Sequence, residues 1–153
     1  MSDLSLYTEY NRKEVHDIFA PSSPFYPQVG QWGMNGVVRI SRENKDFVFF
    51  VRLDRASKYA RGQELTENGT LKWLAPEQQD LKSPLIQTLI KHSHPKNKIY
   101  LFLRTQTSNG FLYMGNLEYQ AHDPESMHPI EFKWKLLNWP PPKEIMTDLL
   151  SSE

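Results

Sequence analysis

The chain of 153 residues contains no cysteine, no long hydrophobic run and no formal net charge. Without cysteine it has no disulfide framework and no thiolate metal site. No apolar run reaches the roughly 20 residues that a membrane-spanning helix needs, and no signal-peptide pattern opens the chain. We therefore expect a soluble, cytoplasmic protein, and the overall charge gives no argument for a polyanionic partner.

Motifs of enzymatic chemistry are absent as well. We find no glycine-rich phosphate loop before a helix, no nucleophile elbow and no HExxH pattern. A metal site would need three or four of the five histidines to converge, and four of them, His92, His94, His122 and His128, are predicted at a helix end or in a loop. His16 and Asp17 are neighbours on a predicted helix, where adjacent side chains point in different directions. We expect no catalytic residue, no metal and no cofactor; a small metal-dependent hydrolase is the least favoured alternative.

Aromatic residues are plentiful, at 12% of the chain, and the clearest structural signal is built from them. In the segment 98–119, KIYLFLRT has apolar side chains on both faces, as a strand covered on both sides requires. Asn109-Gly110 favours a tight reversal. The following run, FLYMGNLEY, places Phe111, Tyr113, Leu117 and Tyr119 in alternation. The sequence predicts a buried hairpin in the middle of a sheet.

Further strands are predicted at 36–40, 46–53, 70–74 and 130–136, the last with clean alternation. Asn11 and Glu14 form a capping-box pattern for a short helix that ends at Pro21, and Ser83-Pro84 begins a second. Residues 21–36 are predicted to be a loop, and KEIMTDLL near the end a third helix. The expected fold is α+β, with a strongly bent, mostly antiparallel sheet and about three short helices. One form of it would be a small PUA-like barrel.

We expect one domain over residues 1–153, with a core module at 7–139 and a C-terminal helix within 140–153. Charge is unevenly distributed along it. Between Arg39 and Arg61 seven basic residues stand against three acidic ones, and Lys91 to Arg104 contains four basic residues and no acid. From Asp123 to the end, six acids outnumber three lysines. Such asymmetry predicts one basic face, with ordinary solvated loops as the alternative.

Aromatic rings beside arginine and lysine suit nucleic acid, because bases stack on rings while cations hold phosphates. A flipped or modified base needs a pocket with flat walls and a few hydrogen-bonding groups. Trp134 alternates with core residues and is interpreted as structural. Trp32 and Trp73 remain candidates for a wall, although a loop tryptophan such as Trp32 more often plugs the end of a barrel.

The order of several short segments resembles an uncharacterised bacterial domain family. The segments are Tyr10 with Arg12, the strand at Phe49-Phe50-Val51, Trp73, and the hairpin LFLRT…YMG. The similarity covers roughly residues 7–139. That family is found C-terminal to restriction-type DEAD/DEAH helicases, often with a phospholipase-D-like nuclease, or beside HNH endonuclease domains. The resemblance implies a DNA-targeting role in restriction or defence and supplies no catalytic residues.

Together these observations predict a non-catalytic DNA-binding specificity module that reads a modified base or backbone in double-stranded DNA, with a nuclease or helicase as partner. The alternative is a protein-docking or scaffold domain that never touches DNA. The nature of the modification, the strandedness of the target and the oligomeric state are left open. The residues predicted to bind nucleic acid are Arg12, Trp32, Arg52, Tyr59, Arg61, Trp73, Gln78, Gln79, Lys82, Arg104 and Tyr113.

Overall fold

One bent, mostly antiparallel sheet of eight strands carries four short helices. The computed structural model describes residues 4–41, 43–53, 63–76, 78–94, 96–105, 110–125 and 129–150. The strands are β1 (Glu9–Tyr10), β2 (Val37–Arg39), β3 (Phe47–Arg52), β4 (Glu64–Leu65), β5 (Thr70–Leu74), β6 (Ile99–Arg104), β7 (Phe111–His122) and β8 (Glu131–Leu136). The helices are α1 (Arg12–Phe19), α2 (Gly30–Met34), α3 (Pro84–Ile90) and α4 (Lys143–Leu150).

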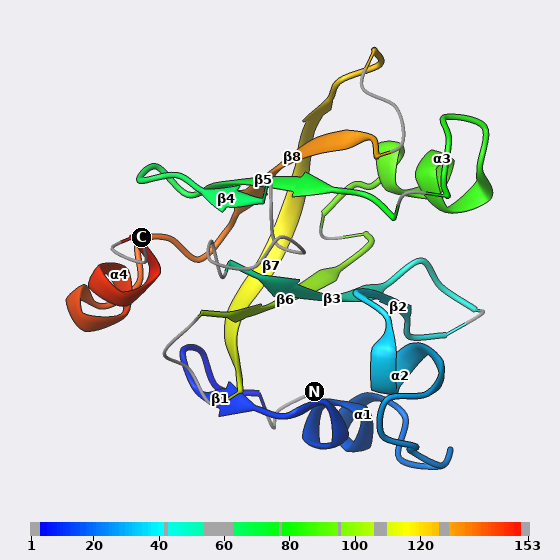
Figure 1. Cartoon of the computed structure of the whole chain (residues 1–153), viewed down its shortest axis with the longest axis horizontal. Coiled ribbons are helices and arrows are strands. Elements are labelled where there is room, and N and C mark those ends of the chain that lie inside the picture. Colours follow the sequence, from blue (N-terminus) through cyan, green and yellow to red (C-terminus); the bar gives the residue numbers. More distant parts are fainter. Residues whose placement is uncertain are drawn as a thin grey trace.

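The strand order is β2-β3-β6-β7-β8-β5-β4, and β1 pairs with β7. All pairs are antiparallel except β3 with β6. Figure 1 shows two halves, β2-β3-β6 and β8-β5-β4, joined by the long strand β7. The edge strands β2 and β4 do not pair with each other, so the described strands form an open, strongly curved sheet and no closed barrel.

Strand β7 passes between the halves through a bulge. Its register with β6 shifts between Tyr113 and Asn116, where β7 carries one extra residue. Gly115 lies in this bulge with φ of +89°, a conformation that favours glycine. A Cβ at this position would lie 2.2 Å from Oδ1 of Asn138, so the bend also requires a residue without a side chain.

The bulge reverses which side chains of β7 face inward. Before it, Phe111 and Tyr113 pack on the outer face of the sheet; after it, Leu117 and Tyr119 pack against the inner core. The sequence prediction that all four share one face is therefore wrong. Alternation places residues on fixed faces only while each one pairs once across the ladder.

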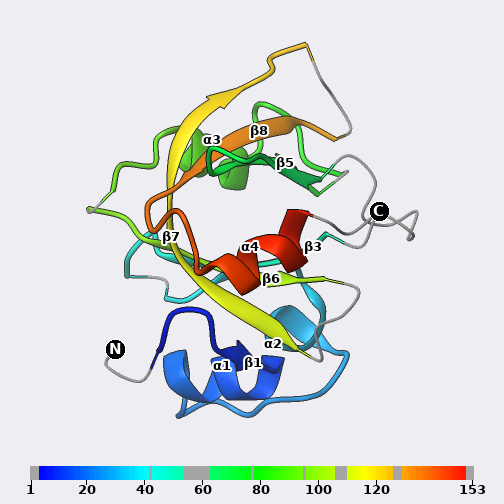
Figure 2. The ribbon, with the colours of Figure 1, turned by 90° about the vertical axis from the view of Figure 1, so that its left-hand side faces the viewer.

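The inner face of the curved sheet encloses the main hydrophobic core. Trp134 and Phe132 of β8, Trp73 of β5 and Phe49 of β3 meet there from the two halves. Ile86 and Leu89 of α3 and Leu149 of α4 add to the same core. In Figure 1, α4 lies at the left end and α3 at the right end of the space between the halves, and in Figure 2, seen from the left, α4 is in front. Trp134 is fully buried, which confirms its structural interpretation.

The outer face of β3, β6 and the first part of β7 forms a second, smaller cluster. Val15 of α1 packs there on Val48, Phe50, Phe102 and other residues. Helix α1 begins with the predicted capping box: the Glu14 amide donates to Asn11 Oδ1 at 2.8 Å, and the Asn11 amide donates to Glu14 Oε1 at 2.9 Å.

Three elements were not expected from the sequence. Residues 30–34, predicted to be loop, form α2, and Gly33 lets the chain fold back because a Cβ there would lie 2.2 Å from the carbonyl oxygen of Tyr26. Strands β1 and β4 are two residues each, too short for an alternation signal. None of the described helices has the length and apolar character needed to cross a membrane.

Candidate nucleic-acid interface

Two arginines lie side by side where β3 and β6 end. The strands are parallel, and the last paired residues in the register are Arg52 and Arg104. Both side chains are exposed. Residues paired in this way point to the same face of a sheet, and here that is the outer face, which Phe50 and Phe102 also share. The fold therefore places two guanidinium groups on one surface at one end of the parallel pair.

A third arginine reaches the same surface from α1. The guanidinium carbon of Arg12 lies 4.3 Å from the ring centroid of Phe50 and 5.6 Å from that of Phe111. The guanidinium carbon of Arg104 lies 5.7 Å from the Phe111 ring, so two cations share one aromatic ring. We call Arg12, Arg52, Arg104 and Phe111 the arginine patch.

Arg12 is more enclosed than its neighbours, and its donors are engaged. It donates to the backbone oxygens of Asn35 at 2.8 Å, Trp32 at 3.2 Å and Met34 at 3.3 Å. These carbonyls end helix α2, where a cation is favourable. Burial, followed by the charge of Arg104, lowers the pKa of Arg12. Arg12 thus fastens α2 to the sheet, with its donors directed at these carbonyls.

Phe111 was not among the predicted site residues. The hairpin register supplied a usable signal: Leu103 pairs with Leu112, so the next positions along the two strands are Arg104 and Phe111. Extending the hairpin by one residue pair beyond Leu103 and Leu112 places the Phe111 ring beside Arg104.

Two of the predicted aromatic walls lie inside the protein. Trp73 is 3% exposed and stacks on Phe49, with ring centroids 4.6 Å apart, so its faces are covered by core residues. Tyr113 is 9% exposed within the outer cluster, and burial, with smaller effects of Tyr100 and Tyr10, raises its pKa to about 12. Neither ring offers an open face to a base in this structure, because alternation turns both toward packed surfaces.

Trp32 keeps an accessible side, although away from Arg52 and Arg104. Its ring lies nearly parallel to that of Phe19, at 6.3 Å, and both line a hollow of about 600 Å³ with Arg39 of β2. Arg39 pairs with Phe47 at the start of β3, whereas Arg52 is at its end. A six-residue strand spans roughly 17 Å. The hollow beside the Trp32 ring therefore lies away from Arg52 and Arg104, whereas the Trp32 backbone accepts a hydrogen bond from Arg12 of the patch.

The polar segment after β5 also lies elsewhere. Gln78 and Lys82 are exposed, Gln79 is partly exposed, and all three precede α3. Helix α3 lies before the start of β6 along the chain, and Figure 1 shows β3 and β6 running away from it. These side chains do not join the patch at the other end of those strands. The predicted contacts Tyr59 and Arg61 lie outside the described residues.

His16 differs from its prediction. Its Nδ1 lies 2.8 Å from Oδ1 of the adjacent Asp17, and its Nε2 lies 3.1 Å from Oγ of Ser23. The expectation that the neighbouring side chains diverge is wrong for this pair. The imidazole is 1% exposed beneath Phe25 and Trp32, and the Ser23 hydroxyl is also within 3.1 Å of the Ala20 carbonyl. This cluster ties the end of α1 to the following loop.

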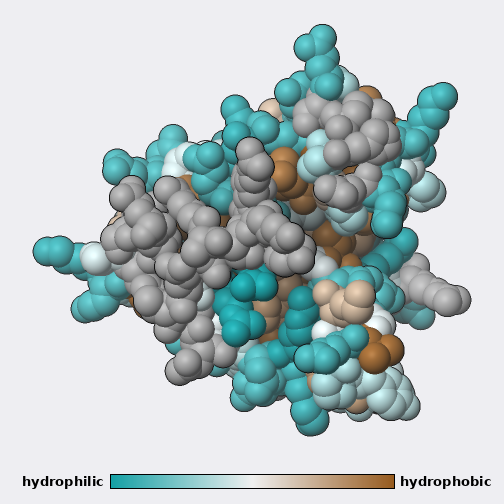
Figure 3. All heavy atoms as spheres, viewed as in Figure 1, coloured by the Kyte–Doolittle hydropathy of each residue, from teal (hydrophilic) through white to brown (hydrophobic). Residues whose placement is uncertain are grey.

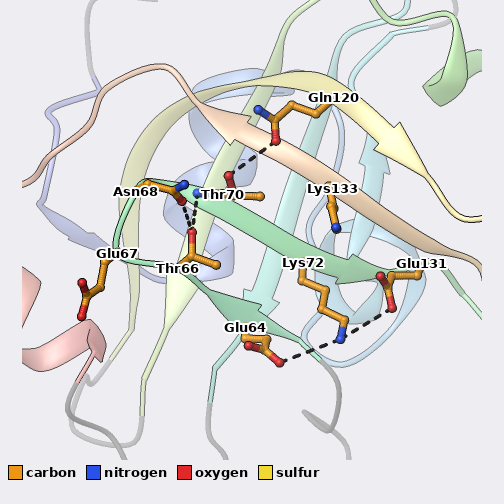
Figure 4. Close-up of a pocket in the computed structure, with 9 residues that line it drawn as sticks. All are labelled: Glu64, Thr66, Glu67, Asn68, Thr70, Lys72, Gln120, Glu131 and Lys133. Carbon is orange, nitrogen blue, oxygen red and sulfur yellow. Dashed lines mark hydrogen bonds and ion pairs between the residues drawn. The ribbon is translucent and has the colours of Figure 1, made fainter.

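The outer face of the other half of the sheet holds a hollow of about 700 Å³ with charges of both signs (Figure 4). Lys72 lies between two carboxylates, 3.6 Å from Glu131 and 3.9 Å from Glu64. Figure 3 shows the face of the whole molecule that Figure 1 presents. Hydrophilic residues cover much of this face, and hydrophobic residues are visible near its middle. Because three glutamates line it beside two lysines, this hollow suits a polyanion less well than the arginine patch does.

Solved structures with the same fold include SRA domains crystallised with DNA. The SUVH5 SRA domain in complex with hemi-methylated CG DNA matches with a TM-score of 0.56 and 12% identity, over 92% of this chain and 94% of that one. The same domain bound to fully hydroxymethylated CG DNA matches with a TM-score of 0.55 and 12% identity, over 92% and 93%. Arabidopsis thaliana SUVH6 in complex with SAM gives 0.52 and 11%, over 90% of this chain and 27% of that one.

At such low identity these likenesses establish the fold alone, which this chain, with its open sheet, shares with the SRA domains. No curated protein sequence matches the chain. One family does: its sequence pattern covers residues 4–149, nearly the whole of the described structure. The chain belongs to the family described as Domain of unknown function (DUF3427).

Proposed function

We propose that this chain is a non-catalytic module that binds double-stranded DNA and reads a modified base or backbone. The observation that carries the proposal is the likeness, across 92% of the chain, to SRA domains solved with methylated and hydroxymethylated CG DNA. The arginine patch supports it, since adjacent exposed guanidinium groups are the groups that DNA phosphates attract. We further propose that the module directs a nuclease or helicase partner in a restriction or defence system.

The test is direct binding of the full chain to labelled duplexes. Fluorescence polarisation would compare one sequence in four forms: plain, methylated, hydroxymethylated and phosphorothioated. We expect weak, salt-dependent binding to all four and at least tenfold tighter binding to one modified form, which corresponds to about 1.4 kcal/mol. Equal affinity for all four would remove the reading function and leave a general DNA-binding module. No binding at about 50 mM salt would remove the DNA function altogether.

A protein-docking function is the second candidate, and one surface favours it. Three large apolar side chains in and before α2 are well exposed: Tyr26 at 61%, Val29 at 63% and Met34 at 66%. Exposed apolar side chains that lie close together along the chain are typical of contact surfaces. On this reading Met34→Lys would abolish association with the partner and leave binding to every duplex unchanged. A loss of duplex binding in Met34→Lys would argue against separate surfaces.

A further inference from the structure

We infer that Arg52 and Arg104 form a clamp for one phosphate group of the DNA backbone, and that Arg12 and Phe111 hold the clamp in place. This inference rests on the proposed function and deepens it, because it assigns the surface that meets the phosphodiester chain. It separates two residues that contact the ligand from two that position them.

The geometry of the parallel pair supports a shared ligand. Arg52 and Arg104 are register partners, and neighbouring strands lie about 4.8 Å apart. Two guanidinium groups on such adjacent stems can both reach a single phosphate, each presenting a planar fork of N–H donors. Strands β3 and β6 are held together by six consecutive register pairs. The spacing between the backbones of Arg52 and Arg104 is therefore fixed before any ligand binds.

Electrostatics point the same way. Like charges that face each other across neighbouring strands destabilise a sheet, and a third guanidinium approaches from α1. The effect of Arg104 on the pKa of Arg12 shows that these cations are close enough to repel. An anion bound beside Arg12 and Arg104 would offset this repulsion and so stabilise the fold.

Phe111 and Arg12 have a different part in the patch. The Phe111 ring lies beneath the guanidinium of Arg104, a contact that restricts where this long side chain can point. Arg12 lies on the same ring and is bonded to three carbonyls of α2. Its hydrogen bonds are already made, so we assign it the positioning of Phe111 and, through that ring, of Arg104.

The first test measures the salt dependence of duplex binding. For B-DNA the slope of log K against log salt is about −0.9 for each phosphate neutralised. Because the two arginines share one phosphate, Arg52→Gln and Arg104→Gln should each reduce the slope, and the double variant should reduce it by about 0.9 in total and weaken binding by roughly tenfold at 0.1 M salt, equally for plain and modified duplexes. Lys135→Gln is the matched control, because Lys135 is an exposed cation on β8 in the other half of the sheet. It should leave the slope unchanged.

The second test needs no DNA. Inorganic phosphate should raise the melting temperature of the wild-type chain above its value in chloride of equal ionic strength. The double variant, which carries both Arg52→Gln and Arg104→Gln, should not show this increase. Arg12→Lys should lower the melting temperature itself, while its phosphate effect becomes smaller but persists. A double variant that retains the whole phosphate effect would overturn the clamp.

The two tests separate failure of the clamp from failure of the proposed function. Duplex binding with an unchanged slope in both arginine variants would overturn the clamp and leave the DNA function standing. Absence of duplex binding, together with a phosphate effect that the variants lose, would support the phosphate site and overturn DNA as its source.

Discussion

The two aromatic clusters on the two faces of the curved sheet have the same kinds of ring and opposite surroundings. On the inner face, Trp73 and Trp134 pack with phenylalanines from both halves and are closed from solvent. On the outer face, Phe50 and Phe111 lie beneath guanidinium groups at the edge of the protein. Aromatic residues near basic ones in the sequence therefore indicate little about binding; the face on which a ring lies decides its role.

The sharpest test of this contrast is truncation of one tryptophan from each cluster. Trp73→Ala should lower the free energy of unfolding by about 3–5 kcal/mol, because it opens a cavity in the inner core. Trp32→Ala should lower it by about 1–2 kcal/mol, because the ring is half-buried and the hollow beside it already holds solvent space. Urea denaturation monitored by circular dichroism measures both. Equal losses would contradict the difference between the clusters.

The junction between the faces can be tested at Gly115. Gly115→Ala should cost about 3 kcal/mol, because φ of +89° strains a residue with a Cβ and that atom would meet the side chain of Asn138. Adding Asn138→Gly should recover the part that comes from the contact and leave the backbone part. A neutral Gly115→Ala variant would show that the bulge can shift, so that the two faces are not fixed by it.

Arg12 tests whether the outer cluster is held by its cation. Arg12→Leu should lower the free energy of unfolding by about 2 kcal/mol, because three carbonyls at the end of α2 lose a charged donor. Arg104→Gln is the matched comparison on the same ring, and its effect on stability should stay within about 0.5 kcal/mol because the side chain is exposed. Equal destabilisation by the two variants would assign Arg104 a structural role.

The smallest expected effect concerns pH at the rim of the inner cluster. His92 packs against Trp134, and burial is the main cause that lowers its pKa, with Asn97, His94, Glu118 and Asp46 as further influences. The folded state therefore favours the neutral imidazole, and the unfolded chain binds a proton more readily. The contribution of the neutral His92 imidazole to the free energy of unfolding is complete above about pH 6.5. It is lost as the pH falls from 6.5 toward the lower pKa of His92 in the folded state.

Urea midpoints measured between pH 7.5 and 5.5 test this sign. The wild-type chain should lose stability slightly as the pH falls, and His92→Gln should show a flatter profile over the same range. A wild-type midpoint that rises on acidification would mean that the charged imidazole is the form favoured in the fold.

Local features of the fold were accessible from the sequence. The capping box of α1 and six of the strands in the bent sheet follow from short-range patterns. Helix α2 and the two-residue strands β1 and β4 did not, because their residues carry no periodic signal and are fixed by contacts with distant parts of the chain.

The candidate site was harder to predict. Of the proposed residues, Arg52 and Arg104 are brought together and Arg12 joins them, whereas Trp73 lies in the core. The Trp32 ring lines a hollow with Arg39, which pairs with the start of β3. The sequence showed basic residues near aromatic residues along the chain. Whether their side chains lie close together in space depends on which strands pair and in which register. When two parallel strands are distant in the sequence, the residues of one strand do not indicate which strand it pairs with.

The sequence alone determined where the longer strands and the helices α1, α3 and α4 form, and which side chains share a face in a strand without a bulge, since side chains along a strand point to alternate faces. Only the tertiary structure decided that β3 and β6 run parallel with Arg52 beside Arg104, and that a bulge at Gly115 turns the second half of β7 inward. The physical reason is that pairing between distant segments depends on the packing of the whole core, which no single stretch of the chain encodes.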